Sequence, residues 1–365
     1  MLGAALAVVV LSPPCARGQA LPDYDFQWST IGSPGNRAAN AQEAPNFFLP
    51  PPLNPPGGRQ VGAVNHDYRL SRTEVTTAQW FEFVQAYTPY YSGAVNDPAF
   101  TSLWINATDF EPGHDPGYQV SEGTENLAAP VSWRYAARYV NWLHNDKGTE
   151  QSAFETGAYD TSTFTQNLDG SFNDQLVHDP GAQFWLPTLD EWTKGMHYDP
   201  HRYGAGQEGY WLYPHGSDEP PIPGYPDQGG ESLAGVPLGT GPILPVGSFP
   251  TVQSPWGLLD GSGGLTEWLE YTNPNGDRRT RGADGERDFN PDGDMSRLDR
   301  VTGGQAHFQL MGVRVASVVP SPSGLGPLTI CCVVLVRRRR EAFCRIFRDR
   351  CSDSAGRSFP TEPLW

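Results

Sequence analysis

A glycine-rich run near residue 260 constrains this chain more than any other segment. Residues 249–268 combine several glycines with Asp260, Glu267 and two tryptophans. Glycine lets a backbone turn tightly and expose its carbonyl groups. Carboxylates together with accessible carbonyl oxygens are the ligands that calcium takes in proteins. The run therefore predicts a tight loop that can hold a calcium ion. The alternative is a turn whose carboxylates cap nearby backbone N–H groups.

The composition indicates a loop-rich globular protein. The chain has 365 residues, of which 12% are aromatic and 11 are tryptophan, enough to fill a sizeable core. Its 41 glycines and 35 prolines follow no repeat, which argues against collagen and against a simple helical bundle. Without its two ends, the chain would hold about 300 residues, which fits one large domain or two small ones.

The N-terminus has the pattern of a signal peptide. Residues 1–20 contain an apolar run, and Gly18 and Ala20 place small residues where a signal peptidase cleaves. Export is therefore expected, and the alternative is a buried structural segment. Residues 21–61, rich in proline, asparagine and glycine, are predicted to be an extended lead-in.

The C-terminus predicts a second targeting signal. A Pro/Ser segment at 319–323 leads into the apolar residues 324–336, which are followed by the arginines 337–340. The apolar stretch is shorter than the about 20 residues that span a bilayer, but a basic cluster after it can stop translocation. The segment 319–340 resembles a PEP-CTERM sorting tail, and the alternative is a hydrophobic tail without function. Residues 341–365 stay unassigned. Membrane contact is expected only through the C-terminal tail that begins at residue 319.

Charge and cysteine content exclude several functions. Residues 337–365 hold 8 basic and 4 acidic residues, which leaves 17 basic and 37 acidic residues in the rest of the chain. Such an acidic body repels nucleic acid and anionic membranes and suits divalent cations. All five cysteines lie at position 15 or beyond position 330. The body therefore has no disulfide, no thiolate zinc site and no cysteine nucleophile.

Local patterns predict a few helices and strands between the loops. A strand is expected over 68–75, an edge strand over 28–36 and a closing strand over 311–317. A helix is expected over 77–87 after the N-cap Thr76, and another over 133–144 after Ser132. Thr188 and Glu191 have the spacing of a capping box that opens a third helix. The side chains predicted to face inward are Trp80, Phe81, Val84 and Tyr87 in the first helix, and Ala136, Tyr139, Val140 and Leu143 in the second.

Several blocks in this order resemble the formylglycine-generating enzyme family, also called sulfatase-modifying factors. The blocks lie at residues 72–83, 130–143, 185–192, 245–250, 257–268, 281–282 and 312–316. Among them, residues 257–268 are similar to the family pattern G-L-x-D-x-x-G-N-x-x-E-W. The resemblance implies an α+β, C-type-lectin-like fold of the sulfatase-modifying-factor type over 62–318. This fold is loop-rich, with short antiparallel strands, a few helices and bound calcium.

The resemblance also assigns calcium ligands. It implies the side chains of Asp260 and Glu267 and the carbonyls of Gly263 and Leu265. A second candidate comes from spacing alone, because residues 288–299 approach the spacing of an EF-hand loop. Its ligands would be Asp288, Asn290, Asp292, Asp294 and Asp299, although such acidic turns are often only solvated.

Two histidine features are weaker candidates. His197 and His201 have an i, i+4 spacing, but Pro200 interrupts a helix there. His307 is expected to be a packed or surface residue.

One departure from the family decides the function expected here. Active members oxidise a substrate cysteine to formylglycine with copper and a close pair of cysteines. In this chain, the interval where the family has these cysteines is 283–311, and it contains no cysteine. No soft thiolate ligand for Cu(I) is therefore present there, and bound copper is not expected. The leading hypothesis is a calcium-stabilised binding or surface module for an unknown protein or glycan ligand. The alternative is an active oxidoreductase that modifies sulfatases. An iron-dependent sulfoxide-synthase-like activity would need a histidine triad that the sequence does not show.

Overall fold

The computed structural model describes residues 21–44, 58–108, 116–168, 172–236, 241–272, 278–283, 302–303 and 311–320. The proposed signal peptide and most of the C-terminal tail lie outside these ranges. The helices are α1 (Thr77–Tyr87), α2 (Pro98–Thr101), α3 (Trp133–His144), α4 (Ser152–Glu155), α5 (Leu189–His197) and the short 3-10 helices η2 (Thr88–Tyr90), η3 (Thr161–Thr163) and η4 (Pro226–Gln228). The strands are β1 (Trp28–Ile31), β2 (Tyr68–Ser71), β3 (Ile105–Ala107), β4 (Tyr118–Val120), β5 (Phe184–Trp185), β6 (Tyr198–Asp199), β7 (Gly209–Tyr210), β8 (Glu267–Thr272), β9 (Arg278–Arg281), β10 (Thr302–Gly303) and β11 (Ala316–Val318).

A four-stranded antiparallel sheet joins the two ends of the described chain. Its order is β1-β2-β11-β5, so β11 lies between β2 and β5. All four residues of β2 are buried, and the strand ends at Ser71, so it is shorter than the predicted 68–75. The closing strand is also shorter than the predicted 311–317, because Met311 and Gly312 make only isolated bridges. The predicted edge strand is found as β1, at the edge of this sheet, but it ends at Ile31 and not at Asn36 as predicted.

A second sheet carries the glycine-rich run into the core. It has the order β10-β9-β8, and Glu267 in β8 pairs with Arg281 in β9. Glu267 also forms an isolated bridge with Gly312, which brings the chain just before β11 next to β8. The remaining strands form two small pairs, β3 with β4 and β6 with β7.

Helix α1 begins and packs nearly as the sequence predicts. Thr76 is the N-cap, and Gln79 completes a capping box that sequence reasoning did not identify. The buried positions include Trp80, Val84 and Tyr87, as predicted, but the fourth large one is Phe83. The predicted Phe81 is only partly buried.

Helix α3 fills the space between α1 and the sheets with aromatic side chains. All four predicted inward residues are buried. Ser132 is the N-cap residue, but its side chain makes no capping hydrogen bond. The first residue, Trp133, is buried, donates from its indole N–H to the carbonyl of Leu269 at 3.1 Å, and lies beneath the guanidinium of Arg278 at 3.4 Å.

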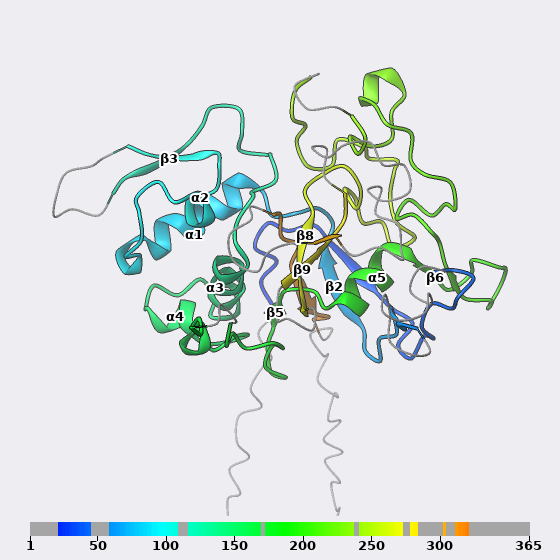
Figure 1. Ribbon diagram of the computed structural model, residues 1–365, viewed down its shortest axis with the longest axis horizontal. Helices are drawn as coiled ribbons and strands as arrows, with labels where there is room; N and C mark the ends of the chain where they lie inside the picture. The colour runs from blue at the N-terminus through cyan, green and yellow to red at the C-terminus, as the bar shows by residue number, and fades with distance from the viewer. Residues whose placement is uncertain are drawn as a thin grey trace, which may run out of the picture. The chain divides into compact units, whose positions relative to one another are not determined.

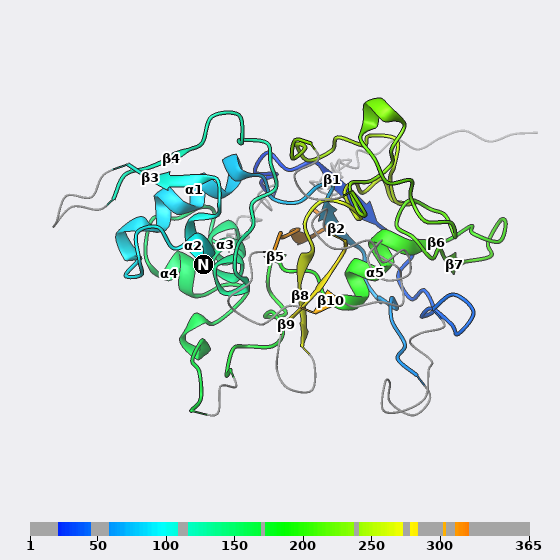
Figure 2. The same cartoon turned by 45° about the horizontal axis from the view of Figure 1, so that its top comes forward.

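Helix α5 begins at the predicted capping box. The Thr188 side chain accepts from the N–H of Glu191, and Glu191 accepts from the N–H of Thr188. Figures 1 and 2 show α1, α3 and α4 on one side of the sheets, with α5, β6 and β7 on the other. Long loops between β7 and β8 cover the region beyond α5.

The fold is thus a mixture of a few helices and short antiparallel strands joined by long loops. Its core is one large cluster in which aromatic side chains from α1, α3, β5 and α5 meet. No helix among the described residues is long and apolar enough to cross a membrane.

Candidate functional site

The glycine-rich run forms a loop that ends in strand β8. Asp260 has a φ of 55°, in the left-handed region that aspartate tolerates better than most residues. Its Oδ2 accepts a hydrogen bond from the N–H of Gly247 at 2.6 Å. Burial raises the pKa of Asp260 to about 6, against the opposing effects of the Gly247 N–H and Arg314. The loop therefore holds this carboxylate in one defined place.

Glu267, at the end of the loop, is committed to a buried ion pair. Its Oε1 accepts from Nη2 of Arg314 at 2.8 Å, and its Oε2 accepts from Nε at 3.0 Å. The indole N–H of Trp192 in α5 donates to Oε2 at 2.8 Å. Both charged side chains are essentially unexposed. Burial by itself would lower the pKa of Arg314, but the charge of Glu267 and the hydrogen bonds to it raise it overall.

A third carboxylate, Glu74, lies beneath the same loop. Its Oε1 accepts from the N–H of Leu265 at 2.7 Å, whereas its Oε2 is buried and accepts no hydrogen bond from the described part of the chain. Gly264 leaves room for this carboxylate, because a Cβ at this position would lie 2.3 Å from Glu74 Oε1 and would force the Glu74 side chain to shift. Burial raises the pKa of Glu74 well above its usual value, and the neighbouring Asp260 and Glu267 add to this effect.

The structure places the four predicted calcium ligands on or next to the glycine-rich loop. Asp260, Gly263 and Leu265 lie on one loop, and the N–H groups of Gly263 and Leu265 are bound to Ala283 and Glu74. Glu267 is close by, but Arg314 and Trp192 occupy its oxygens. The buried Glu74 Oε2 and the excess of carboxylates over guanidinium fit a cation at this loop. Among the described residues, no three His, Cys, Asp or Glu side chains form a metal-binding group on their own. An ion here would also need backbone carbonyls.

The other predicted metal ligands are the EF-hand-like segment and the histidines. Residues 288–299, with Asp288, Asn290, Asp292, Asp294 and Asp299, lie outside the described residues, as does His307. His197 is fully buried, and its Nδ1 lies 3.1 Å from the carbonyl oxygen of Trp211. Burial and the charge of Arg281 lower the pKa of His197 well below its usual value. His201 lies on an exposed turn after β6, so the two histidines face different surroundings.

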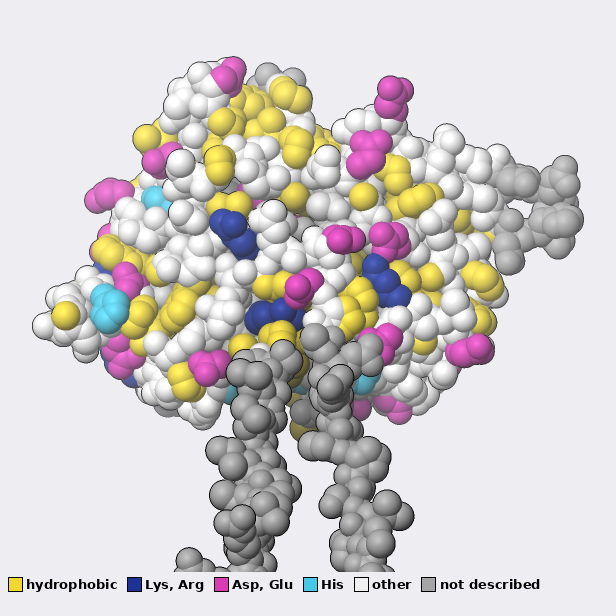
Figure 3. Space-filling view, turned by 180° about the vertical axis from the view of Figure 1, so that it is seen from behind, with side chains coloured by type: hydrophobic (Ala, Val, Ile, Leu, Met, Phe, Trp, Pro, Cys, Tyr) yellow, Lys and Arg dark blue, Asp and Glu magenta, His cyan; other side chains and the backbone are white. Residues whose placement is uncertain are grey.

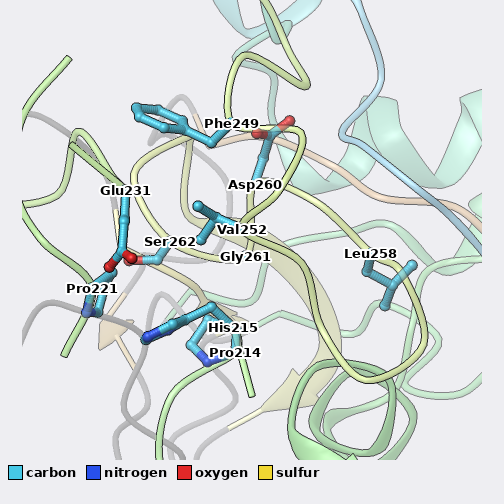
Figure 4. A pocket seen from close by; sticks show the side chains of 10 residues that line it. All are labelled: Pro214, His215, Pro221, Glu231, Phe249, Val252, Leu258, Asp260, Gly261 and Ser262. Carbon is cyan, nitrogen blue, oxygen red and sulfur yellow. The ribbon is translucent and has the colours of Figure 1, made fainter. Parts of the chain in front are cut away.

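A pocket opens beside Asp260 on the loop-rich side of the domain. Figure 4 shows its lining, which consists of Pro214, His215, Pro221, Glu231 and residues from the stretch 249–262. A larger and more open hollow of about 480 Å³ shares His215, Glu231, Phe249 and Val252 with it. Among the described residues, neither lining contains Lys or Arg. The pocket beside Asp260 has a volume of only about 10 Å³, enough for one water, so a ligand would have to lie in the larger hollow, which combines apolar and polar groups.

Two side chains give the pocket its polar character. The Nδ1 of His215 is buried without a hydrogen-bond partner in the described part of the chain. Burial lowers the pKa of His215, although Glu231 opposes this, so the ring is neutral at pH 7. Glu231 accepts from the N–H of Ile222 at 2.9 Å through Oε2. A neutral imidazole and a carboxylate can each bind a hydroxyl or amino group of a ligand.

Sequence reasoning missed four members of these sites. Glu74 and Arg314 lie in blocks that resemble the family, but nothing in their spacing, 240 residues apart, shows that they meet at Glu267. His215 and Glu231 lie in a polar stretch without periodicity. Glu74 lies inside the strand predicted over 68–75, so no local signal marked it as a member of the site.

The fold and the site define a mixed α+β domain in which loops, and not the helices, carry the polar groups. The chain belongs to the sulfatase-modifying factor enzyme 1-like domain family, whose profile matches residues 34–318. A comparison with curated proteins finds no match.

Comparison with solved structures finds 23 similar chains. One is CarF, with a TM-score of 0.44 and 18% identity over 81% of this chain and 99% of CarF. Another is PvdO from Pseudomonas aeruginosa, with a TM-score of 0.40 and 16% identity over 84% of this chain and all of PvdO (100%).

Proposed function

We propose that this chain is an exported member of the family that binds a ligand and does not generate formylglycine. The observation that carries the proposal is the lack of any cysteine from residue 16 to residue 330. The oxidation of a cysteine through copper needs soft ligands, and carboxylates and carbonyls suit harder cations. Family membership by itself favours the competing function, an oxidoreductase that modifies sulfatases, and the cysteine content argues against it.

The larger hollow next to the pocket beside Asp260 is the proposed ligand site. Its walls include Phe249 and prolines, which offer apolar surface to a sugar ring or an aliphatic side chain. Glu231 and the neutral His215 offer hydrogen-bond partners for hydroxyl or amino groups. The described lining residues include no Lys or Arg, which disfavours phosphate or carboxylate ligands. These features support a glycan or a protein segment as the ligand.

Calcium is the proposed structural cofactor. The ion would bind the carboxylate of Asp260 and carbonyls of the same loop, Gly263 and Leu265, and supply positive charge beneath the pocket. Asp260 lines the small pocket that shares Phe249 and Val252 with the hollow, so the ion would help to hold this shared wall in place. Calcium-stiffened loops of this kind suit recognition, because less conformational entropy is lost when the ligand binds.

The surface and the ends of the chain support a role outside the cytoplasm. Figure 3 shows acidic side chains scattered over one face, with few basic ones among many uncharged and apolar groups. Residues 1–20 are proposed to direct export, and residues 319–340 to sort the protein to the cell envelope.

The test is a binding screen of the protein against glycans and exported proteins, with calcium and with EDTA. The expected result is a ligand whose binding requires calcium and weakens about tenfold or more in Glu231→Gln and His215→Ala. Glu219→Gln is the matched control, because Glu219 is an exposed carboxylate on the same loop that does not line the pocket. Binding that ignores both pocket variants would place the ligand elsewhere and contradict this site.

A further inference from the structure

Arg59 and Arg279 are neighbouring cations without an acidic partner among the described residues. Arg59 lies in the segment that leads to β2, Arg279 lies in β9, and both side chains are partly exposed. Burial lowers the pKa of the Arg59 guanidinium, and the positive charge of Arg279 lowers it further. Neither side chain forms an ion pair or a hydrogen bond with the described part of the chain. Two positive charges therefore lie side by side with nothing described to neutralise them.

The other arginines of the described chain are all engaged by the protein itself. Those in ion pairs with carboxylates are Arg37, Arg69, Arg134, Arg202 and Arg314. Those that donate to backbone carbonyls are Arg72, Arg138 and Arg278, and Arg281 lies 3.5 Å from the ring of His197. Because acidic residues outnumber basic ones in the body of the chain, two adjacent arginines without an acid contrast with the rest of the domain.

An irregularity in the second sheet brings the two arginines together. The pairing of β8 with β9 shifts between Trp268 and Thr272, which leaves the β8 residues between them opposite Arg279. Tyr271 is one of these residues, and the guanidinium of Arg59 lies over its ring at 4.9 Å from the ring centre. Such stacking uses the flat face of a guanidinium and leaves the N–H donors at its edge for a ligand. The sheet thus holds Arg59 beside Arg279 with donors to spare.

We propose that Arg59 and Arg279 form a binding site for a phosphate group, carried by a small phosphate monoester or present as the free ion. Two guanidinium groups match a doubly charged anion, and each presents its N–H donors in a planar fork that suits phosphate oxygens. A phosphate monoester carries about −1.5 to −2 charges at pH 7. A carboxylate brings only one charge, so it would leave one of the two arginines without a partner.

The site lies apart from the ligand site and the calcium proposed above. Arg59, Arg279 and Tyr271 line neither the hollow nor the small pocket beside Asp260. The acidic body of the chain repels nucleic acid and anionic membranes, which carry many charges over a large area. A small ligand with a single phosphate group avoids most of this repulsion, and it is the ligand class that the pair fits.

The test is a titration of the full-length protein with inorganic phosphate at constant ionic strength, followed by calorimetry. The wild type should bind phosphate, and Arg59→Gln and Arg279→Gln should each weaken the binding about tenfold or more, because each removes charged hydrogen bonds to the anion. Arg72→Gln is the matched control. It removes the same charge from a partly exposed arginine that donates to the carbonyl of Gly257, and it should keep the wild-type affinity.

Two further titrations identify the form of the ligand. Glycerol phosphate that binds at least as tightly as inorganic phosphate would support the site with a monoester as its ligand. Inorganic phosphate that binds alone would support the site with the free ion as its ligand. Acetate should bind at least about tenfold more weakly than phosphate. Equal affinity for acetate would show that any anion screens the two charges, and it would overturn the proposal.

The remaining outcomes also decide the proposal. A wild type that binds neither form of phosphate would overturn it, and so would wild-type affinity in Arg59→Gln and Arg279→Gln. An equal loss of affinity in Arg72→Gln would show that binding follows net charge and not these two side chains. If Arg279→Gln does not fold, Arg279→Lys, which keeps the charge but loses the planar fork, takes its place. Wild-type affinity in that variant and in Arg59→Gln would contradict the site.

Discussion

Arg314 and Glu267 form a bidentate ion pair in the centre of the domain, with N–O distances of 2.8 and 3.0 Å. Arg314 comes from the segment just before β11, and Glu267 begins β8. The remaining donors of Arg314 bind the carbonyls of Ser71 and Leu259. One guanidinium thus connects both sheets and the glycine-rich loop, so the position of that loop depends on this pair.

Breaking this ion pair should strongly destabilise the domain. Arg314→Met leaves Glu267 buried without its counter-charge, and a loss of about 3–5 kcal/mol in the free energy of unfolding is expected. The double variant Arg314→Met, Glu267→Met removes both charges and should lose less than the sum of the two single changes. Urea denaturation of the four proteins measures the coupling. A cost below about 1 kcal/mol for Arg314→Met would show that the pair behaves like an exposed one.

Chelation of calcium should lower the melting temperature of the wild type. A ligand at a hundredfold excess over its Kd adds about 2.7 kcal/mol to the stability of the folded state. Asp260→Asn keeps an acceptor for Gly247 and a residue type that tolerates the left-handed φ, so it removes mainly the charge. Scanning calorimetry with and without EDTA should therefore show a smaller shift in this variant. If EDTA lowers the melting temperature of the wild type and of Asp260→Asn equally, Asp260 is not a calcium ligand.

A histidine–glutamate pair predicts a pH dependence of stability. His178 Nδ1 lies 2.8 Å from Oε1 of Glu270, which also accepts from the hydroxyl of Tyr159 at 2.6 Å. Burial lowers the pKa of His178, but the hydrogen bond and charge of Glu270 outweigh it and raise the pKa above 6.5. The folded state therefore binds a proton more tightly than the unfolded state.

The contribution of this pair has a defined sign. It is fully present below the unfolded-state pKa of His178, near 6.5, and is lost as pH rises through the higher folded-state value. The stability of the wild type relative to His178→Gln should fall over that window, as measured by urea denaturation at a series of pH values. If the difference in the free energy of unfolding between the wild type and His178→Gln stays constant or grows as pH rises, the raised pKa of His178 is contradicted.

The C-terminal boundary of the fold is predicted to lie at the end of β11. Val318 donates its N–H to the carbonyl of Gln183 at 3.2 Å, and β11 pairs with strands on both sides. Deletion of 319–365 should leave a folded, soluble domain and, in the native host, move it from the cell envelope to the medium. Deletion of 316–365 removes an interior strand and should abolish folding. Aggregation of the shorter deletion would show that the tail belongs to the core.

The sequence predicts those parts of this fold that depend on local interactions. The capping box at Thr188 and the buried face of α3 follow from spacing within one turn or helix, and both are confirmed. The strands were predicted too long, because the extent of β2 and β11 depends on partners far away in the chain. The same holds for the site. The glycine-rich run in the sequence was enough to single out Asp260. The ion pair between Glu267 and Arg314 joins residues far apart in the chain, and no local sequence pattern indicates it.

The most direct test of the proposed function is an assay for the family's reaction. The purified protein is incubated with a Cys-x-Pro-x-Arg peptide, Cu(I) and oxygen, and the peptide is analysed by mass spectrometry. Because residues 16–330 contain no cysteine to hold Cu(I), no formylglycine above the enzyme-free control is expected. Formation of the aldehyde above that control would contradict the proposal and establish the chain as an active oxidase.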